Sequence, residues 1–416
     1  MFKLISIMNI TIITILLPYP LDSGGTQAQY NMIDTIRHEH HISLVFPENG
    51  HNSPEALKQL KALWPEVNFY SYSYFRQLCY LPFLMAKAKR AINLALRKHN
   101  RAFLMERALQ PYGYDLSKSF VRFVKDAVRR SEPDIVQVEF YPYLGLVSVL
   151  PPEVKKIFVH HEIRYIRNAR ILKNLSPTTR HWTLWERLKT TEIEQLNQFD
   201  GIITLTDNDR ETLSKDGVSR PLFTSPAAIN TFQRSYQPWN HTVVFLGGVS
   251  HGPNVEGLIW MLKEVLPSIP SKQLSKITLK IIGKGWTTDM LPKVSGLNIV
   301  CTGFVEHLER EALGGIMVVP ILSGSGMRMK ILEGAALSLP MVSTTVGAEG
   351  LDFADGEACL MADSPLEFAQ AMVRLFQDEE LRKSIAIGAS RIFETKYSRG
   401  ALCSLRERIY HQICSQ

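Results

Sequence analysis

A short run of charged residues follows a pair of glycines in the second half of the sequence. Arg328, Lys330 and Glu333 come directly after Gly324 and Gly326. Glycines let backbone N–H groups approach an anion, and a helix N-terminus adds a partial positive charge. Two cations in the first turn of a helix are unfavourable for the helix itself, so they indicate that an anion such as a diphosphate binds there. The Glu333 carboxylate, one turn further on, is suited to accept hydrogen bonds from a ribose diol.

The same segment has a plainer interpretation, in which Arg328 and Lys330 are solvated side chains of an ordinary helix. We favour the phosphate interpretation because the surrounding elements occur in the order that it needs. The sequence predicts a strand at 316–319, the glycine loop, a helix at about 327–337, and a strand at 340–344 that begins with Pro340.

Strand-like and helix-like segments alternate along the whole chain, which predicts parallel sheets with helices on both faces. Segment 230–241 has no apolar period and contains Pro238, so we place a linker there and predict two doubly wound α/β domains, 1–237 and 238–398. The expected strands are 9–17, 41–46, 134–139, 156–160, 201–205, 242–246, 277–282, 298–301, 316–319 and 340–344.

The composition is that of a globular protein. The chain has 416 residues, a formal net charge of +7 and 45% hydrophobic residues, which excludes disordered and collagen-like proteins. Its five cysteines are scattered and form no CxxC pair, which argues against a disulfide scaffold or a zinc site and fits a reducing cytoplasm. Residues 4–17 could be the core of a signal peptide, but polar residues interrupt them, so we predict a buried strand.

The positive charge is concentrated in one stretch. Between Arg76 and Arg130 there are thirteen lysines and arginines against three acidic residues. Within it, residues 83–111 interleave apolar and basic residues at helical spacing, as in helices that lie on anionic membranes. The alternative is a helix packed on the sheet with a solvated basic face. No recognition motif supports nucleic-acid binding.

The segment 318–351 resembles the C-terminal domain of family-4 glycosyltransferases, the retaining group of the GT-B fold. These enzymes carry two glutamates separated by seven residues. Glu333 matches the second, which binds the nucleotide ribose in the family, and Ser325 stands where the first would fall. Residues 324–333 instead match a subgroup pattern, G-x-G-x-R-x-K-x-x-E. The resemblance places further residues near the nucleotide sugar: Gly247, Gly248, Asn254, Gly283, Met327, Gly347 and Glu349.

The first half of the chain resembles the same family more loosely. Gly24 and Gly25 follow the first strand and would face the diphosphate and the acceptor, although a plain turn is the alternative. HHEIRYIR, at 160–167, resembles the stretch whose histidine hydrogen-bonds the donor sugar. Successive strand residues point to opposite faces, so only one histidine should reach that place, and we choose His161 over His160.

The resemblance implies a GT-B fold in which two Rossmann-like domains face a cleft, with the final helix, 399–416, returning to the N-terminal domain. It implies a retaining transfer from a nucleotide-diphosphate sugar to a saccharide or lipid-linked acceptor, in surface polysaccharide biosynthesis, in the cytoplasm or on the inner face of the membrane. The catalytic residues would be His161, Arg328, Lys330 and Glu333, and no cofactor or metal is expected because the sequence has no suitable Asp-x-Asp pair.

Two other functions stay open at this point. One is an epimerase or hydrolase of nucleotide sugars, which would need further acid and base carboxylates. The other is a non-catalytic subunit that binds nucleotide, which the serine at position 325 would fit. A nicotinamide dehydrogenase is disfavoured because 18–26, after the first strand, lacks the G-x-G-x-x-G spacing.

Overall fold

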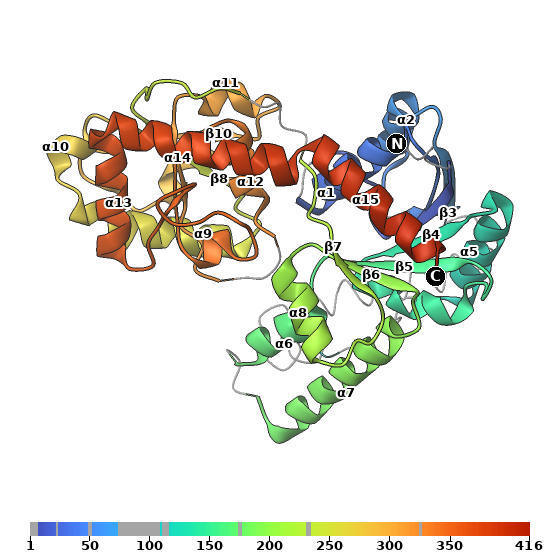
Figure 1. Ribbon diagram of the computed structural model, residues 1–416. Helices are drawn as coiled ribbons and strands as arrows, with labels where there is room; N and C mark the ends of the chain where they lie inside the picture. The colour runs from blue at the N-terminus through green and yellow to red at the C-terminus, as the bar shows by residue number, and fades with distance from the viewer. Residues whose placement is uncertain are drawn as a thin grey trace. The chain divides into compact units, whose positions relative to one another are not determined.

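The computed structural model describes residues 7–21, 24–48, 52–73, 109, 116–173, 177–229, 234–323 and 327–416. The chain forms two compact units (Figure 1). Unit 1 comprises Met1–Pro226 together with Cys403–Gln416, and unit 2 comprises Ala227–Leu402. The domain bounds expected from the sequence, 1–237, 238–398 and 399–416, stay a prediction beside these units.

The described residues of unit 1 form a parallel sheet of seven strands in the order β3-β2-β1-β4-β5-β6-β7. The strands are β1 Asn9–Ile13, β2 His41–Glu48, β3 Asn68–Ser73, β4 Ile135–Glu139, β5 Lys155–His160, β6 Gly201–Thr204 and β7 Leu222–Thr224. The helices in its described residues are α1 Gly24–Ile36, α2 Pro54–Leu63, α5 Lys118–Ser131, η2 Tyr141–Val149, α6 Arg164–Lys173, α7 Thr179–Leu196, α8 Asp207–Lys215 and α15 Arg399–Cys414, whose first four residues belong to unit 2.

The first strand is shorter than the sequence predicts. It ends at Ile13 rather than at Leu17, because the Thr14 hydroxyl closes a local turn. That hydroxyl donates to the carbonyl of Leu16 at 3.1 Å and accepts from the Leu16 amide at 3.2 Å. Threonine hydroxyls stabilise such turns in competition with a sheet ladder. The chain therefore leaves the sheet four residues early and turns toward α1.

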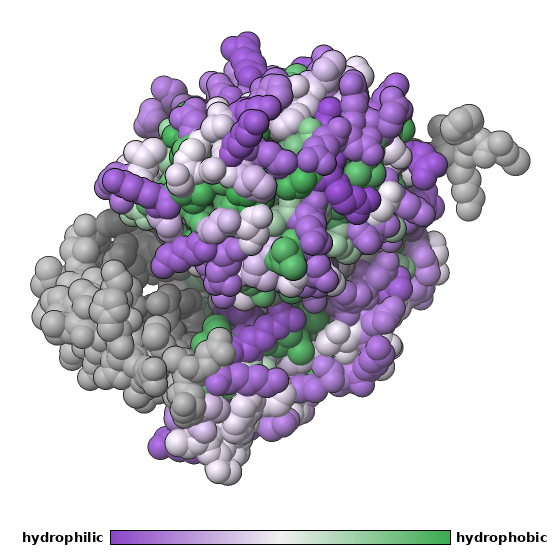
Figure 2. Space-filling view, turned by 90° about the vertical axis from the view of Figure 1, so that its left-hand side faces the viewer, coloured by the Kyte–Doolittle hydropathy of each residue, from purple (hydrophilic) through white to green (hydrophobic). Residues whose placement is uncertain are grey.

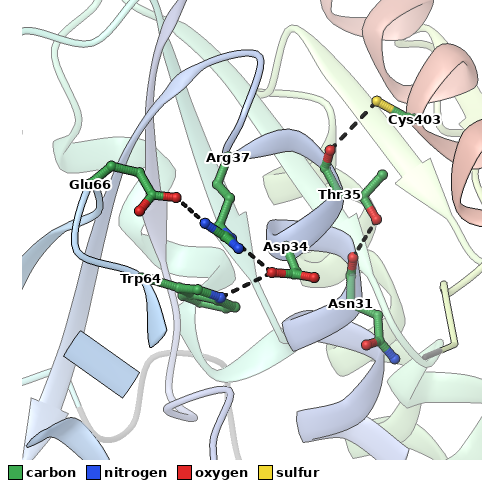
Figure 3. A network of polar contacts seen from close by, with 7 residues as sticks. All are labelled: Asn31, Asp34, Thr35, Arg37, Trp64, Glu66 and Cys403. Atoms are coloured by element: carbon green, nitrogen blue, oxygen red, sulfur yellow. Dashed lines mark hydrogen bonds and ion pairs between the residues drawn. The ribbon is translucent and has the colours of Figure 1, made fainter. Parts of the chain in front are cut away.

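Helix α1 is tied to its neighbours by polar side chains (Figure 3). The Arg37 guanidinium lies 2.7 Å from Asp34 and also contacts Glu66, and the Trp64 indole N–H donates to Asp34 at 3.1 Å. On the other side, the Cys403 thiol of α15 lies 3.6 Å from the carbonyl oxygen of Thr35. These contacts hold the C-terminal helix and the turn before β3 against the same helix.

Over the part of unit 2 that the structure describes, the chain forms a parallel sheet of six strands in the order β10-β9-β8-β11-β12-β13. The strands are β8 Thr242–Leu246, β9 Thr278–Ile282, β10 Asn298–Gly303, β11 Ile316–Val319, β12 Met341–Ser343 and β13 Leu360–Met361. The helices are α9 Gly252–Trp260, η3 Met261–Val265, η4 Leu266–Ser268, α10 Ser271–Leu274, η5 Thr288–Met290, α11 Leu308–Ala312, α12 Met329–Ala336, η6 Val346–Ala348, α13 Pro365–Gln377, α14 Glu379–Ile392 and η7 Phe393–Tyr397.

The sheet of unit 2 has a hydrophobic core on each face. Val243 and Phe245 of β8 belong to one buried cluster, and Val244 between them belongs to the other. Alternate residues of a strand point to opposite faces, so both faces of β8 are covered by helices. In the view of Figure 2, most of the surface is hydrophilic, and hydrophobic side chains appear as scattered small areas.

Each sheet has one point at which the strand order reverses. In unit 1 the chain fills the sheet outward from β1 on one side and from β4 on the other, and in unit 2 the reversal lies between β8 and β11. In open α/β sheets, ligands bind outside the carboxyl ends of the strands at such a point. Among the described residues, no helix is both long enough and apolar enough to cross a bilayer.

Candidate active site

In unit 2, a lysine and an asparagine meet at the carboxyl ends of β8 and β11. Lys330 Nζ donates to Asn254 Oδ1 at 2.7 Å, and Asn254 Nδ2 donates to the carbonyl of Gly248 at 3.0 Å. The ammonium also lies 5.3 Å from the centre of the Phe245 ring, a cation–π distance. The contact joins the start of α9 to the start of α12, across the point where the strand order reverses.

Two glycines make room for this contact. Gly247 has a φ of +150°, and a Cβ there would lie 2.5 Å from the side-chain nitrogen of Asn254. Gly283, with a φ of +154°, packs against the backbone of Gly247, and a Cβ there would overlap its carbonyl. The Trp286 indole N–H donates to that same carbonyl at 2.7 Å. Glycine is therefore required at both positions for the loops after β8 and β9 to touch.

Burial shifts the pKa values of both Lys330 and Glu333 toward neutral pH. Burial, together with the neighbouring positive charge of Arg328, lowers the pKa of Lys330 to about 7, against the opposing effect of Glu333. Burial also raises the pKa of Glu333 to about 7, against the opposing effect of Lys330. Two groups that change charge near neutral pH, side by side at a sheet reversal, are typical of a functional site.

The helix that carries these residues begins later than the sequence predicts. It spans Met329–Ala336 rather than about 327–337, so Lys330 lies in its first turn and Arg328 just before it. Arg328 is only 8% exposed and has a φ of −89° and a ψ of 87°, outside helical values. Its guanidinium is thus not a solvated helix side chain, contrary to the plainer interpretation of the sequence.

The other predicted residues of unit 2 are placed as follows. Gly347 lies after β12, where its amide donates to the Thr344 hydroxyl at 2.9 Å and a Cβ would overlap Ser343. Glu349 ends the turn after η6 and is half-buried, as is Met327. The predicted loop residues Gly324, Ser325 and Gly326 lie outside the described residues.

In unit 1, a histidine and a buried glutamate meet at the carboxyl ends of β4 and β5. His161 Nε2 contacts Glu139 Oε2. The glutamate side chain is fully buried, whereas that of His161 is 14% exposed. The Phe140 ring stacks on the imidazole, with ring centres 4.1 Å apart and planes 12° apart. Phe140 has a φ of +67°, which a side chain rarely adopts and which costs on the order of 1–3 kcal/mol.

The neighbouring histidine faces the other way. His160 Nε2 lies 2.9 Å from Glu192 Oε1 of α7, and both side chains are buried. Glu192 also accepts from the backbone amides of Arg164 and Tyr165 at the start of α6. Burial lowers the pKa of His160 to about 3, so its imidazole is neutral near pH 7. Of the two histidines, His161 is the one partly open to solvent within unit 1.

Gly24 and Gly25 begin α1, after β1. A Cβ on Gly25 would lie 3.7 Å from Leu16 and 4.0 Å from the Phe140 ring, which are ordinary contacts. The described residues therefore leave room for a side chain at position 25. Packing among the described residues of unit 1 gives no reason for a glycine there.

Several residues that surround these contacts were missed by sequence reasoning. Gln137, Phe140 and Tyr410 lie around Glu139, and Phe245 and Trp286 lie around Asn254. One signal was available: β4 reads IVQVE, so two polar residues alternate on an otherwise apolar, fully buried strand. The aromatic residues carry no such signal, because they are common in any core.

A groove of about 730 Å³ lies elsewhere on unit 1, between the end of α5 and the end of η2. Lys125, Arg129, Glu132 and Glu153 contribute its charged side chains. No residue predicted to act in catalysis or donor binding lines this groove. It is therefore separate from the Lys330–Asn254 contact and from the His161–Glu139 contact.

The match to a known protein family lies within unit 2. Residues 240–378 match the model of the family described as Glycosyl transferases group 1, which confirms the predicted resemblance to glycosyltransferases; that the chain is of the retaining group stays a prediction. A protein of Klebsiella pneumoniae, named "Uncharacterized 44.6 kDa protein in cps region", is 28% identical over 167 residues. That match covers 38% of this chain and 43% of that protein, so it spans less than half of the relative.

Solved structures resemble the whole chain. TarM has a TM-score of 0.68 at 13% identity, and the match covers 99% of this chain and 99% of TarM. Sucrose-phosphate synthase from Thermosynechococcus elongatus has a TM-score of 0.68 at 13% identity, over 98% of this chain and 99% of that one. HepE from Anabaena, in complex with UDP and glucose, has a TM-score of 0.63 at 11% identity, over 98% and 100%. These matches confirm the GT-B fold with two Rossmann-like domains; that the domains face a cleft stays a prediction.

Proposed function

We propose that this chain, whose residues 240–378 match the Glycosyl transferases group 1 family, transfers a sugar from a nucleotide-diphosphate sugar to a saccharide or lipid-linked acceptor with retention of configuration. The observation that carries the proposal is the contact of Lys330 with Asn254 at the reversal point of the second sheet. A desolvated ammonium is unstable unless an anion is near. A diphosphate bound there would supply that charge.

The reaction builds negative charge on the leaving diphosphate. In the proposed mechanism Lys330 and Arg328 stabilise that charge, together with N–H groups of the loop before α12. Cations held in advance in a desolvated site stabilise a transition state more than the same cations in water do. The Glu333 carboxylate accepts hydrogen bonds from the ribose diol and so anchors the nucleotide. Retention follows if the departing phosphate oxygen accepts the proton of the acceptor hydroxyl on the same face of the sugar.

The similar proteins support the substrate class. A TarM variant of S. aureus was solved with UDP, Fondaparinux and alpha-GlcNAc-glycerol, and HepE with UDP and glucose. The name of the Klebsiella protein refers to a cps region. We therefore propose a UDP-sugar donor and a role in surface polysaccharide biosynthesis for this chain.

The proposal is tested by offering a panel of nucleotide sugars with saccharide and lipid-linked acceptors, with and without EDTA. We expect one donor to be consumed only when acceptor is present, a product whose anomeric configuration by NMR equals that of the donor, and no loss of rate in EDTA. Donor consumed without acceptor would instead indicate the epimerase or hydrolase. Donor bound without turnover would indicate the non-catalytic subunit.

Membrane association is a further part of the proposal. The basic stretch 83–111, which lies almost wholly outside the described residues, would bind anionic lipid on the inner face of the membrane and bring the enzyme to a lipid-linked acceptor. Co-sedimentation with vesicles that contain about 30% anionic lipid tests this. Replacing the lysines and arginines between 87 and 101 by glutamine should abolish sedimentation, whereas unchanged sedimentation would refute it.

A further inference from the structure

A run of buried hydrogen bonds connects the C-terminal helix to His161 within unit 1. The Tyr410 hydroxyl of α15 donates to Gln137 Oε1 at 2.7 Å, and Gln137 Nε2 donates to Glu139 Oε1 at 2.5 Å. The other oxygen of Glu139 contacts His161 Nε2. Tyr410, Gln137 and Glu139 are each 0% exposed. These side chains come from α15, from β4 and from the loop after β5, so the run joins three separate elements.

The direction of each hydrogen bond follows from the chemistry of the groups. Gln137 turns its NH₂ group toward the accepting oxygen of Glu139. Its carbonyl oxygen then faces Tyr410, which has to donate. Burial raises the pKa of Tyr410 to about 12, partly offset by the nearby Arg406, so the hydroxyl keeps its proton. The second carboxylate oxygen requires a proton on His161 Nε2.

We propose that Tyr410, Gln137 and Glu139 are positioning residues that hold His161 as the Nε2–H tautomer, with Nδ1 left as a hydrogen-bond acceptor. The Phe140 ring, carried by a backbone with a positive φ, fixes the plane of the imidazole from one side. A neutral Nδ1 accepts a hydrogen bond from a hydroxyl group, the polar group that every sugar presents. The inference deepens the proposed function and rests on it for the identity of that hydroxyl.

The tautomer is measured by NMR of protein labelled with ¹⁵N in its histidine rings, without any substrate. His161→Gln assigns the signals of residue 161 by their disappearance. At about pH 9, well above the ordinary histidine pKa of about 6.5, we expect Nε2 to carry the proton and Nδ1 to carry none. Protonation of Nδ1, alone or together with Nε2, overturns the proposal.

Glu139→Gln is the decisive variant because it keeps the shape of the side chain. Gln137 still directs its NH₂ group to residue 139, so the new amide turns its carbonyl to Gln137 and its own NH₂ group to His161. His161 Nε2 then has to accept, and the ring should convert to the Nδ1–H tautomer. An unchanged Nε2–H tautomer in this variant overturns the proposal.

Tyr410 is tested through the same signal. In the double variant Glu139→Gln with Tyr410→Phe, the Gln137 amide loses the donor that fixes its orientation, and we expect a mixture of both tautomers. Full conversion, as in Glu139→Gln alone, removes Tyr410 from the proposal. Two controls leave the run intact: Glu162→Gln removes a carboxylate in the loop of His161, and Tyr165→Phe removes another hydroxyl, which donates to Asp216 at 2.6 Å. Neither should change the tautomer.

Activity separates this inference from the proposed function. With the wrong tautomer, kcat for sugar transfer in Glu139→Gln should fall about tenfold to hundredfold, while KM for the acceptor changes little. If the tautomer converts and kcat does not fall, the positioning run stands, and the role of His161 in the proposed transfer is refuted.

Discussion

Lys330 Nζ lies 2.7 Å from Asn254 Oδ1, and the partner of this lysine is thus an amide rather than a carboxylate. An amide oxygen holds the ammonium in place without cancelling its charge. The same asparagine donates to the carbonyl of Gly248, so the cation is fixed with respect to the loop after β8. This arrangement suits a lysine whose charge is meant for a ligand.

Asn254→Asp should weaken binding of a nucleotide-diphosphate sugar about tenfold, which corresponds to about 1.4 kcal/mol. The substitution keeps the shape of the side chain and adds a negative charge beside the ammonium, so less positive charge is left for the diphosphate. Isothermal titration calorimetry measures the affinity. Asn240→Asp is the matched control, because Asn240 donates to Leu313 in the same unit and does not contact Lys330. Equal affinities for wild type and Asn254→Asp would show that the amide is not needed.

Donor binding should move protons in opposite directions below and above neutral pH. At pH 6, Glu333 is largely protonated because burial raises its pKa to about 7. The ribose favours the carboxylate form, so donor binding should release a proton from Glu333. At pH 8, Lys330 is largely neutral because burial lowers its pKa to about 7. The diphosphate favours the ammonium form, so donor binding should make Lys330 take up a proton. Calorimetry in buffers of different ionisation enthalpy counts these protons.

Two variants separate the contributions to this linkage. Glu333→Gln should abolish the release at pH 6, and Lys330→Met should abolish the uptake at pH 8. A nucleotide-diphosphate sugar is the suitable probe, because its phosphates are esterified and do not titrate near neutral pH. Proton movement of one sign at both pH values would contradict the assignment of the two groups.

Gly247→Ala should lower both donor affinity and stability. A Cβ at that position would lie 2.5 Å from the Asn254 side chain, on a backbone with a φ of +150°. We expect a loss on the order of 1–3 kcal/mol in the free energy of unfolding and weaker donor binding, because Asn254 must move away from Lys330. Urea denaturation and calorimetry measure the two effects. Gly252→Ala is the control, since nothing lies within 4 Å of a Cβ there.

Ten of the thirteen strands in the described residues were predicted, because parallel strands that are buried on both faces are continuous apolar runs. The sequence analysis missed β3, β7 and β13, which are edge strands of the two sheets. β8 and β11 lie where they were expected, at Thr242–Leu246 and Ile316–Val319. The end of β1 and the start of α12 were misplaced, because a single hydroxyl at Thr14 and the conformation of Arg328 decide them. The contacts of Asn254 with Lys330 and of Tyr410 with Gln137 were out of reach, since they join residues 76 and 273 positions apart.

Replacing His160 should lower the stability of the protein, whereas replacing the adjacent His161 should lower kcat. His160→Leu leaves the buried Glu192 without its imidazole partner, so we expect a loss of about 1–3 kcal/mol in the free energy of unfolding and little change in kcat. His161→Leu should instead lower kcat by about a hundredfold or more. Denaturation curves and initial rates on the folded proteins check this. A loss of kcat in His160→Leu that exceeds that of His161→Leu would reverse the assignment.

Helix α15 also bears on the order in which the protein is assembled during translation. Tyr410 and Ile413 are 0% exposed in unit 1, and Ile413 packs so closely on Gly201 that a Cβ there would lie 2.6 Å from it. Residues 403–416 are synthesised after the whole of unit 2. In a nascent chain, the sheet of unit 1 therefore lacks the α15 residues that pack on it until the ribosome has finished unit 2. Ribosomes stalled before residue 403 should display unit 1 in a form that proteases cut more readily than the released protein.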